Sequence, residues 1–224
     1  MTVVPEGRST GDSARRRNPI TLGRGSLIAL VVVLAAMLAS TTYRSDSQGA
    51  PGQAAKFDAA KYGAATYKPK VVPAIQKNAV DIAVLHKALA ADGTAAGKKY
   101  GHRDGTGLYS YAVTLTGTAG KAASGLLPVT VPGLGKARVA VQIGPAVNGT
   151  ALRDASGFIR FGQFVNQVDY ADAGTALNNQ MKATLLAHVD AASLQGKKVT
   201  VVGATSPLTA DLLTVTPISI ESAS

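Results

Sequence analysis

The sequence predicts a mainly β fold with helices, in which an OB-like Greek-key β-barrel follows an amphipathic helical segment and one N-terminal transmembrane helix. Three observations support this prediction: a long aliphatic run near the N-terminus, a helical apolar period before residue 92, and a period of two after residue 108. The 224 residues suffice for one domain of moderate size and a tail. A hydrophobic share of 46% with only 16% charged residues excludes global disorder.

The N-terminal region divides into a tail and a candidate membrane span. Residues 1–25 are rich in Gly, Ser, Pro and Arg and lack apolar periodicity, which predicts a disordered basic cytoplasmic tail. The 19 residues between Arg24 and Arg44 carry no charge, and most of them are aliphatic. A helix over this run would reach about 28 Å, close to the hydrocarbon thickness of a bilayer. Residues 26–43 are therefore the predicted transmembrane signal anchor.

Three interpretations of this run compete: an uncleaved anchor, a cleaved signal peptide and a buried core helix. Signal-peptide cleavage requires small residues shortly before the cleaved bond, and Met37 and Leu38 rule out most possible cleavage positions. The uncleaved anchor is therefore favoured. Arginines are more numerous before the run than directly after it, which keeps the N-terminus inside the cell. We expect a single-pass protein of the cytoplasmic (inner) membrane, with a linker over residues 44–56 and an extracytoplasmic OB-like domain over residues 57–222.

An amphipathic helix is predicted from Pro73, which suits a first helical turn, to a stop at Asp92 and Gly93. We expect this helix to pack against the later sheet. The positions that recur at three- and four-residue steps are Ile75, Ala79, Ile82, His86 and Leu89.

Short strands are predicted after the glycine-rich stretch 101–107, where the apolar period changes to two. In the first strand, Tyr109, Tyr111, Val113 and Leu115 share the face that we expect to point into the core. Pro128 interrupts the second strand and predicts a sheet edge there. The predicted strands are residues 109–116, 126–131, 138–143, 181–189, 199–202 and 213–220.

A segment of mixed character, residues 144–179, separates the two groups of strands. Tyr170, Ala173, Leu177 and Met181 follow one another at helical spacing, and Asp169 is the predicted cap of this helix. Three strands, a helix and two or three further strands are typical of the five-stranded OB-fold barrel.

The search for catalytic motifs is negative. Zero cysteine excludes disulfides, thiolate metal sites and cysteine nucleophiles. The Gly-x-Gly pairs lack the third glycine of a dinucleotide loop, and no Walker loop, nucleophile elbow or HExxH motif is present. For the three histidines, a structural or surface role is favoured over a ligand or a base. Asp169 and Asp172 lie one helical turn apart, but a preference for acidic residues at a helix start explains them. We expect no enzyme, no cofactor and no metal.

One stretch between residues 144 and 172 holds more hydrogen-bonding groups than a loop needs, and it is the tentative ligand-binding site. An ion pair between Arg153 and Asp154 that caps the barrel is favoured over a direct grip on a polar ligand, and both remain open. The candidate residues are Asn148, Thr150, Arg153, Asp154, Asn166, Gln167 and Tyr170.

The net charge of +10 is unevenly distributed. Residues 56–103 carry nine Lys and Arg against three Asp, whereas residues 104–224 carry eight against seven acidic residues. Binding of single-stranded nucleic acid requires a basic groove with stacking aromatics on the barrel itself, and the barrel is nearly neutral. We therefore expect no nucleic acid as a partner. Anionic lipid headgroups of the cytoplasmic membrane or a partner protein suit the basic segment better.

From Phe57 to about Ile220 the chain resembles a bacterial family of predicted periplasmic lipoproteins of unknown function, often encoded beside ABC-type sugar importers. The most specific part of this resemblance is Gly149-Thr150-Ala151-Leu152-Arg153-Asp154. The other residues that carry it are Phe57-Asp58, residues 70–73, 77–81 and 97–101, Val141-Gln142-Ile143-Gly144-Pro145, Asn166-Gln167, Tyr170-Ala171 and residues 194–197.

The resemblance implies an OB-like barrel outside the cytoplasmic membrane and, by genomic neighbourhood, a link to carbohydrate uptake. This sequence lacks the cysteine to which such a family attaches its lipid, so either the aliphatic helix of Leu27 to Ala39 holds the domain at the membrane or the attachment is lost. The leading hypothesis is a non-enzymatic accessory or binding protein whose partners are ABC transporter subunits or a solute-binding protein. The alternative is direct binding of a small molecule, a sugar, and a hydrolase is a distant third.

Overall fold

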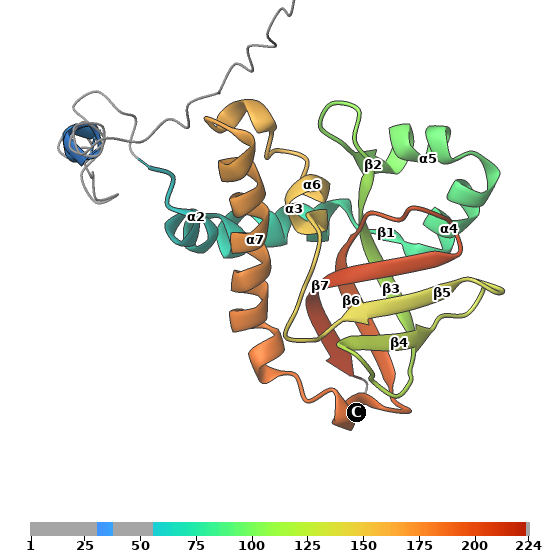
Figure 1. The fold of residues 1–224 in the computed structure, drawn as a ribbon. Helices are drawn as coiled ribbons and strands as arrows, with labels where there is room; N and C mark the ends of the chain where they lie inside the picture. The colour runs from blue at the N-terminus through green and yellow to red at the C-terminus, as the bar shows by residue number, and fades with distance from the viewer. Residues whose placement is uncertain (1–30, 38–55, 223–224) are drawn as a thin grey trace, which may run out of the picture. The chain divides into compact units, whose positions relative to one another are not determined.

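The structure is a computed structural model that describes residues 31–37 and 56–222 (Figure 1). Residues 31–37 form a helix with exposed side chains. Within these two stretches, no helix has the length and apolar character needed to cross a membrane. The remainder of the predicted anchor, the predicted tail and nearly all of the predicted linker lie outside the described residues. The membrane span therefore stays a prediction.

Residues 56–222 contain a series of helices and seven strands. The helices are α2 (Ala59–Thr66), a π-helix (Tyr67–Val71), α3 (Val72–Asn78), α4 (Ile82–Ala91), α5 (Gly93–Tyr100), α6 (Ala151–Ala155), α7 (Gln167–Thr184) and three short 3-10 turns (Phe161–Gln163, Leu186–His188 and Ala192–Leu194). The strands are β1 (Val80–Asp81), β2 (Gly101–His102), β3 (Ser110–Ala119), β4 (Leu126–Thr130), β5 (Arg138–Gln142), β6 (Lys198–Thr205) and β7 (Leu212–Ser222).

Five of the strands close into a barrel in the order β3-β4-β5-β7-β6, with β6 pairing back to β3. All neighbours are antiparallel except β5 and β7, which run parallel. Gly203 sits at a register irregularity between β6 and β7, where a Cβ would overlap the Thr216 carbonyl oxygen. The absence of a side chain there allows the sheet to bend. The predicted Greek-key barrel is confirmed.

The barrel interior is filled by alternate residues of every strand. Val113 and Leu115 of β3 are at most 1% exposed, and they meet Val201 of β6 inside the barrel. Ile82 and Leu85 of α4 belong to the same apolar cluster. Burial of such aliphatic side chains stabilises the fold by roughly 1.5–3 kcal/mol each.

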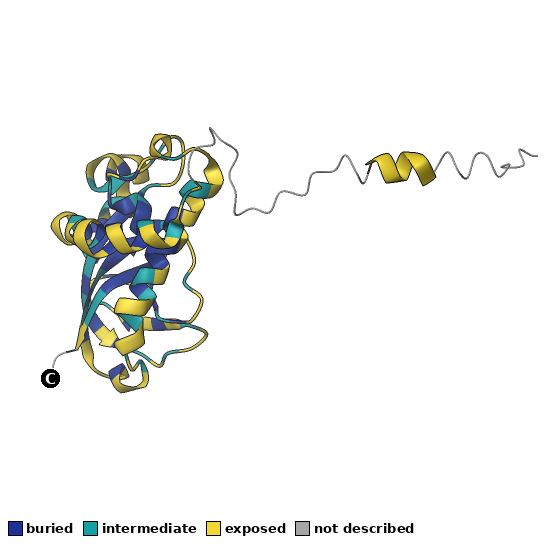
Figure 2. Cartoon of the chain, turned by 90° about the vertical axis from the view of Figure 1, so that its left-hand side faces the viewer, coloured by how far each residue is buried: buried dark blue, intermediate teal, exposed yellow. Residues whose placement is uncertain are grey.

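A second apolar cluster joins the outer surface of the barrel to α3, α6 and α7. Small residues, Ala112 of β3 and Ala204 of β6, form the barrel side of this cluster, and Ile75, Leu152 and Leu177 form the helical side. Figure 2 shows the buried residues between the strands and between the strands and helices. Both faces of β3 are therefore buried, which explains why its alternation is less sharp than that of β4.

The helix predicted from Pro73 to residue 91 is wrong as one element. The chain leaves helical geometry at Ala79, and Val80 and Asp81 pair in parallel with β3. The Asp81 carboxylate then accepts hydrogen bonds from the N–H groups of Ala83 and Val84 and caps a new helix, α4. The apolar residues of α3 and α4 keep the same helical spacing across the break, so the periodicity of the sequence does not reveal it.

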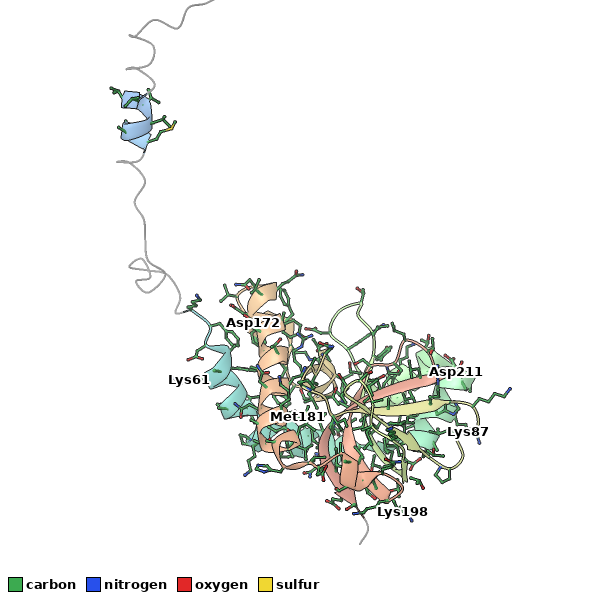
Figure 3. All side chains as sticks on the ribbon, turned by 60° about the horizontal axis from the view of Figure 1, so that its bottom comes forward. Lys61, Lys87, Asp172, Met181, Lys198 and Asp211 are labelled. Atoms are coloured by element: carbon green, nitrogen blue, oxygen red, sulfur yellow. The ribbon has the colours of Figure 1, made fainter. Side chains whose placement is uncertain are left out.

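The strand predicted over residues 181–189 is also wrong. Residues up to Thr184 continue α7, and a 3-10 turn follows at Leu186–His188. Met181, labelled in Figure 3, is fully buried on α7 and belongs to the second apolar cluster. The predicted cap, Asp169, lies instead in the first turn, because α7 begins after Asn166.

The sheet edge predicted from Pro128 is likewise absent, because β4 pairs with β3 on one side and β5 on the other. Proline is tolerated because the β3–β4 ladder ends at the Ala119–Val129 pair. Beyond that pair, the Pro128 carbonyl accepts a hydrogen bond from Gly120, and its missing N–H has no strand residue to meet.

Candidate functional site

The polar centre of the site lies on α6, where Arg153 and Asp154 form an ion pair. Arg153 Nε donates to Asp154 Oδ1 at 2.7 Å, and Thr150 Oγ1 donates to Asp154 Oδ2 at 2.6 Å. The side chains of Arg153 and Asp154 are 9% and 17% exposed. A charge-assisted pair with this little solvent is stronger than a surface pair, and its loss leaves an unmatched charge.

Tyr170 of α7 completes this centre. Arg153 Nη1 donates to the Tyr170 carbonyl oxygen at 2.8 Å, and the guanidinium carbon lies 3.5 Å from the centroid of the Tyr170 ring. The Tyr170 hydroxyl donates to Asp154 Oδ1 at 3.3 Å. Burial, followed by repulsion from the Asp154 carboxylate, raises the pKa of Tyr170 to about 12. The phenol is therefore neutral at physiological pH and acts as a hydrogen-bond donor.

Local structure fixes where α6 ends. The Ser156 hydroxyl donates to the Arg153 carbonyl oxygen at 2.6 Å, and Gly157 adopts a φ of +77° directly after the helix. A side chain at Gly157 would also collide with the His102 ring. Glycine is the residue that turns the chain here without strain.

A pocket of about 280 Å³ opens beside the ion pair. Ser110 begins β3 and Ser206 follows β6, and their hydroxyl oxygens lie 2.6 Å apart. The residues that line the pocket are Asp104, Gly107, Leu108, Ser110, Thr150, Arg153, Asp154, Tyr170 and Ser206.

Asp104 belongs to the loop between β2 and β3, which folds against the segment before α7. Asp104 Oδ2 accepts the Phe161 N–H at 2.5 Å, and Arg160 Nη1 donates to the Arg103 carbonyl oxygen at 3.3 Å. The guanidinium of Arg103 lies over the Tyr109 ring at 4.3 Å from its centroid. These contacts hold the second carboxylate of the pocket in place.

The pocket is rich in hydroxyl groups and carries two carboxylates against one guanidinium. Serine and threonine hydroxyls both donate and accept hydrogen bonds, whereas ionised carboxylates only accept. This combination suits a neutral ligand that presents several hydroxyl groups, and its negative balance disfavours anions. Within the described part of the chain, no three His, Cys, Asp or Glu residues gather as a metal site would require.

The structure brings four of the seven predicted site residues together: Thr150, Arg153, Asp154 and Tyr170 all line the pocket. The interpretation of Arg153 and Asp154 as a structural ion pair fits their geometry, because each is bonded within the protein. The Arg153 guanidinium lies over the Tyr170 ring, and the rings of Phe161 and Phe164 pack against it at steep angles, so contacts within the protein surround this ring.

The other three predicted residues do not line the pocket. Asn166 caps α7, since its side-chain oxygen accepts the Asp169 N–H at 2.9 Å. Asn148 is held through its backbone by the Gln142 side chain, at 3.0 and 3.1 Å. Gln167 is exposed in the first turn of α7.

Sequence reasoning missed Asp104, Ser110 and Ser206. Ser110 and Ser206 are separated by 96 positions and meet only because β3 pairs with β6. The one available signal was the glycine-rich stretch 101–107, because a loop of this composition between two regular elements is often a binding segment.

The comparisons with known proteins agree with this architecture. A family model for "Predicted periplasmic lipoprotein (DUF2291)" matches residues 28–221. The chain belongs to this family. A solved structure, an OB-fold protein from Thermotoga maritima MSB8, aligns with a TM-score of 0.60 at 15% identity and covers 75% of this chain and 99% of that chain. This likeness confirms the OB-like fold and extends to nothing else. Comparison with curated proteins gives no significant match.

Membership in the family indicates an extracytoplasmic, membrane-associated protein of a group without a known function. The resemblance to predicted periplasmic lipoproteins of unknown function is thereby confirmed, whereas the link to sugar importers is untested. The absence of cysteine sets this chain apart from lipoproteins that carry their lipid on a cysteine side chain.

Proposed function

We propose that this chain is a non-enzymatic extracytoplasmic binding protein that holds a small polyhydroxylated ligand, a sugar, in the pocket beside Arg153 and Asp154. The observation that carries this proposal is the lining itself. Ser110, Thr150 and Ser206, which each carry a hydroxyl group, line the same space as Asp104. Vicinal hydroxyls of a sugar donate to a carboxylate and accept from serine and threonine hydroxyls.

The size of the pocket restricts the ligand to one sugar ring or a short polyol. Its volume of about 280 Å³ lies near the lower end of small-molecule sites, roughly 300–1,000 Å³. A phosphorylated sugar would place its charge near two carboxylates, so the neutral sugar should bind better. Leu108, which is 55% exposed at the pocket, offers an apolar surface to the C–H face of a ring.

The non-enzymatic part of the proposal rests on how the two carboxylates are engaged. Asp154 accepts hydrogen bonds from Thr150, Arg153 and Tyr170. Asp104 accepts the Phe161 N–H with one oxygen. A glycoside hydrolase needs one carboxyl as an acid and the other as a base or nucleophile, both free to approach the substrate. Asp154 with its three internal donors fits a positioning role instead.

Calorimetric titration with a panel of hexoses, pentoses and polyols tests the binding. We expect saturable heat from at least one neutral sugar, and affinity reduced about ten-fold in Ser206→Ala, because one hydroxyl contact is lost. Ser222→Ala, which removes an exposed hydroxyl at the end of β7, is the matched control and should bind like the unmodified protein. Absence of heat for every sugar, or equal affinity in Ser206→Ala, contradicts the proposal.

The accessory role in carbohydrate uptake is a separate part of the proposal. Its support is the extracytoplasmic, membrane-associated family together with a pocket whose groups suit a sugar. Affinity purification from membranes in mild detergent should recover subunits of an ABC-type importer or a solute-binding protein. Recovery of neither class, with the bait intact, contradicts the accessory role and leaves the sugar-binding test unaffected.

A further inference from the structure

A second and larger hollow lies on the outer surface of the barrel, over β4, β5 and the start of β7. Its volume is about 590 Å³. It shares no lining residue with the pocket at Asp154. We call it the outer groove and define it by Lys121, Leu126, Pro128, Lys136, Arg138 and Leu212, which all line it.

The floor of the outer groove is apolar because of the strand alternation. Leu127 and Val129 of β4 point into the barrel, so Leu126 and Pro128 point outward. Leu126 and Leu212 are 38% and 45% exposed, although both are large aliphatic residues. Leu126 pairs with Gln142 of β5 and Leu212 pairs with Arg138, so the two leucines lie at the two ends of the floor along β5. Exposed aliphatic residues in a concave surface are typical of a binding site rather than of ordinary surface.

The rim of the outer groove is basic. Lys121 lies in the β3–β4 loop, Lys136 lies in the β4–β5 hairpin, and Arg138 begins β5. No acidic residue lines the groove. Asp211, an acidic residue, directly precedes Leu212 in the chain. Its backbone carbonyl oxygen accepts the Arg138 N–H at 2.9 Å. Among the residues that the structure describes, only Arg153 and Asp154 form an ion pair, so the three rim cations have no carboxylate partner.

Together, the apolar floor and the unneutralised rim define the ligand chemistry. We infer that the outer groove binds a free single-chain amphipathic anion, whose alkyl chain lies on Leu126 and Leu212 and whose acidic head meets Lys136 and Arg138. An anion gains from three nearby positive charges, and an alkyl chain gains from leaving water. The lining contains no aromatic side chain on which a nucleobase or sugar ring could stack.

The position of the groove favours a free amphiphile over the bilayer surface as the occupant. The described part of the domain begins at Lys56, next to α2, and α2 packs against α7. Figures 1 and 3 show α2, with Lys61, on the opposite side of the barrel from β4 and β5. Within the described domain, the groove therefore lies on the face away from Lys56, where this domain begins.

Photo-labelling of the full chain in discs of zwitterionic lipid tests this inference. The probe is a twelve-carbon carboxylate with a diazirine in its alkyl chain, and the labelled peptides are identified by mass spectrometry. We expect labelling to concentrate in peptides that cover residues 121–142. The methyl ester of the same probe, which has no charge, should label these peptides at least about five-fold less.

Two variants of the groove and one matched control complete the test. Lys136→Gln/Arg138→Gln removes rim charge and Leu126→Asn disrupts the floor, and each should reduce labelling of these peptides about five-fold or more. Lys61→Gln/Lys77→Gln removes two charges from exposed residues of α2 and α3 and should leave labelling unchanged. Uniform labelling of exposed segments, equal labelling by the methyl ester, or unchanged labelling in both groove variants overturns the inference.

Discussion

Arg153 is the residue that ties the two helices of the site together. Its guanidinium lies on the Tyr170 ring, donates to the Tyr170 carbonyl oxygen and pairs with Asp154. A lysine in this position could not make the planar stack and two directed hydrogen bonds at once. The charge of Arg153 is therefore satisfied inside the protein, and the residue positions the pocket wall instead of gripping a ligand.

Replacement of Asp154 tests this structural role. We expect Asp154→Asn to lower the free energy of unfolding by about 2–4 kcal/mol, because Arg153 would keep its charge at 8% exposure without a counterion. Urea denaturation measures the change. Asp172→Asn, at an exposed position of α7 (Figure 3), should change stability by less than about 0.5 kcal/mol. Equal effects of the two variants would show that the ion pair contributes nothing.

The pKa of Tyr170 makes a second prediction at this scale. Burial, followed by the Asp154 charge, raises it to about 12 from 10.0, and burial raises the pKa of Tyr67 to about 12 as well. Because the folded-state pKa lies above the unfolded one, the neutral phenol stabilises the fold below pH 10, and this contribution is lost as the pH rises through 12. In an alkaline titration followed by phenolate absorbance, Tyr170→Phe should show one fewer tyrosine with a pKa of about 12 than the unmodified protein. Loss of a group that titrates near 10 instead would contradict the assignment.

Among the elements, α7 depends on its first turn to place Tyr170 against Arg153. Asn166 accepts the Asp169 N–H, which satisfies one of the free donors at the helix start. The sequence predicts Asn166 as a ligand-binding residue and Asp169 as the cap of this helix. Both amino acids are favourable near a helix start, so composition does not separate the two roles.

Removal of the cap distinguishes a structural role of Asn166 from a direct contact with ligand. Asn166→Ala should lower the free energy of unfolding by about 1 kcal/mol. Gln167→Ala, one residue later and without a capping hydrogen bond, should change it by less than about 0.5 kcal/mol. Thermal and urea unfolding measure both. Unaltered stability in Asn166→Ala, combined with weaker sugar binding, would show that Asn166 contacts the ligand and does not act as a stabilising cap.

Strands were easier to predict than the ends of helices. Val113, Leu115 and Val201 alternate with residues that face the helices, so the period of two survives even where both faces are buried. The break at Ala79 depends on a parallel pairing of Val80 with Val113, a contact across 33 positions that local periodicity does not register. In the same way, alternating apolar residues after Met181 fit a strand, but packing of Met181 in the second cluster continues α7.

Across the whole molecule, the predictable part of the site is the part that is contiguous in sequence. Arg153 and Asp154 lie on one short helix that begins after Thr150, whereas Ser110 and Ser206 come together through barrel closure. The barrel architecture is predicted by the grouping of three strands, a helix and two or three further strands, although one of those strands, residues 181–189, is not formed. The residues that the barrel brings together could not be read from that grouping, because register decides which strand ends meet.

Membrane attachment is a prediction at this scale. The full chain should remain with membranes after alkaline carbonate extraction and keep its N-terminal residues by intact-mass measurement, because the uncharged run between Arg24 and Arg44 is long enough to span a bilayer. A variant that begins at Lys56 should be released, since residues 56–224 form a compact unit with their own core. Extraction of the full chain, or loss of its first 40 residues, would contradict the uncleaved anchor.

The most direct test of the central claim is nuclear magnetic resonance of the backbone amides during titration with the sugar that gives the largest calorimetric heat. Our account predicts saturable shifts at Asp104, Ser110, Thr150 and Ser206, with residues of the outer groove unchanged. Shifts confined to β4 and β5, or none at any residue of the pocket, would show that the space beside Arg153 and Asp154 does not bind a sugar.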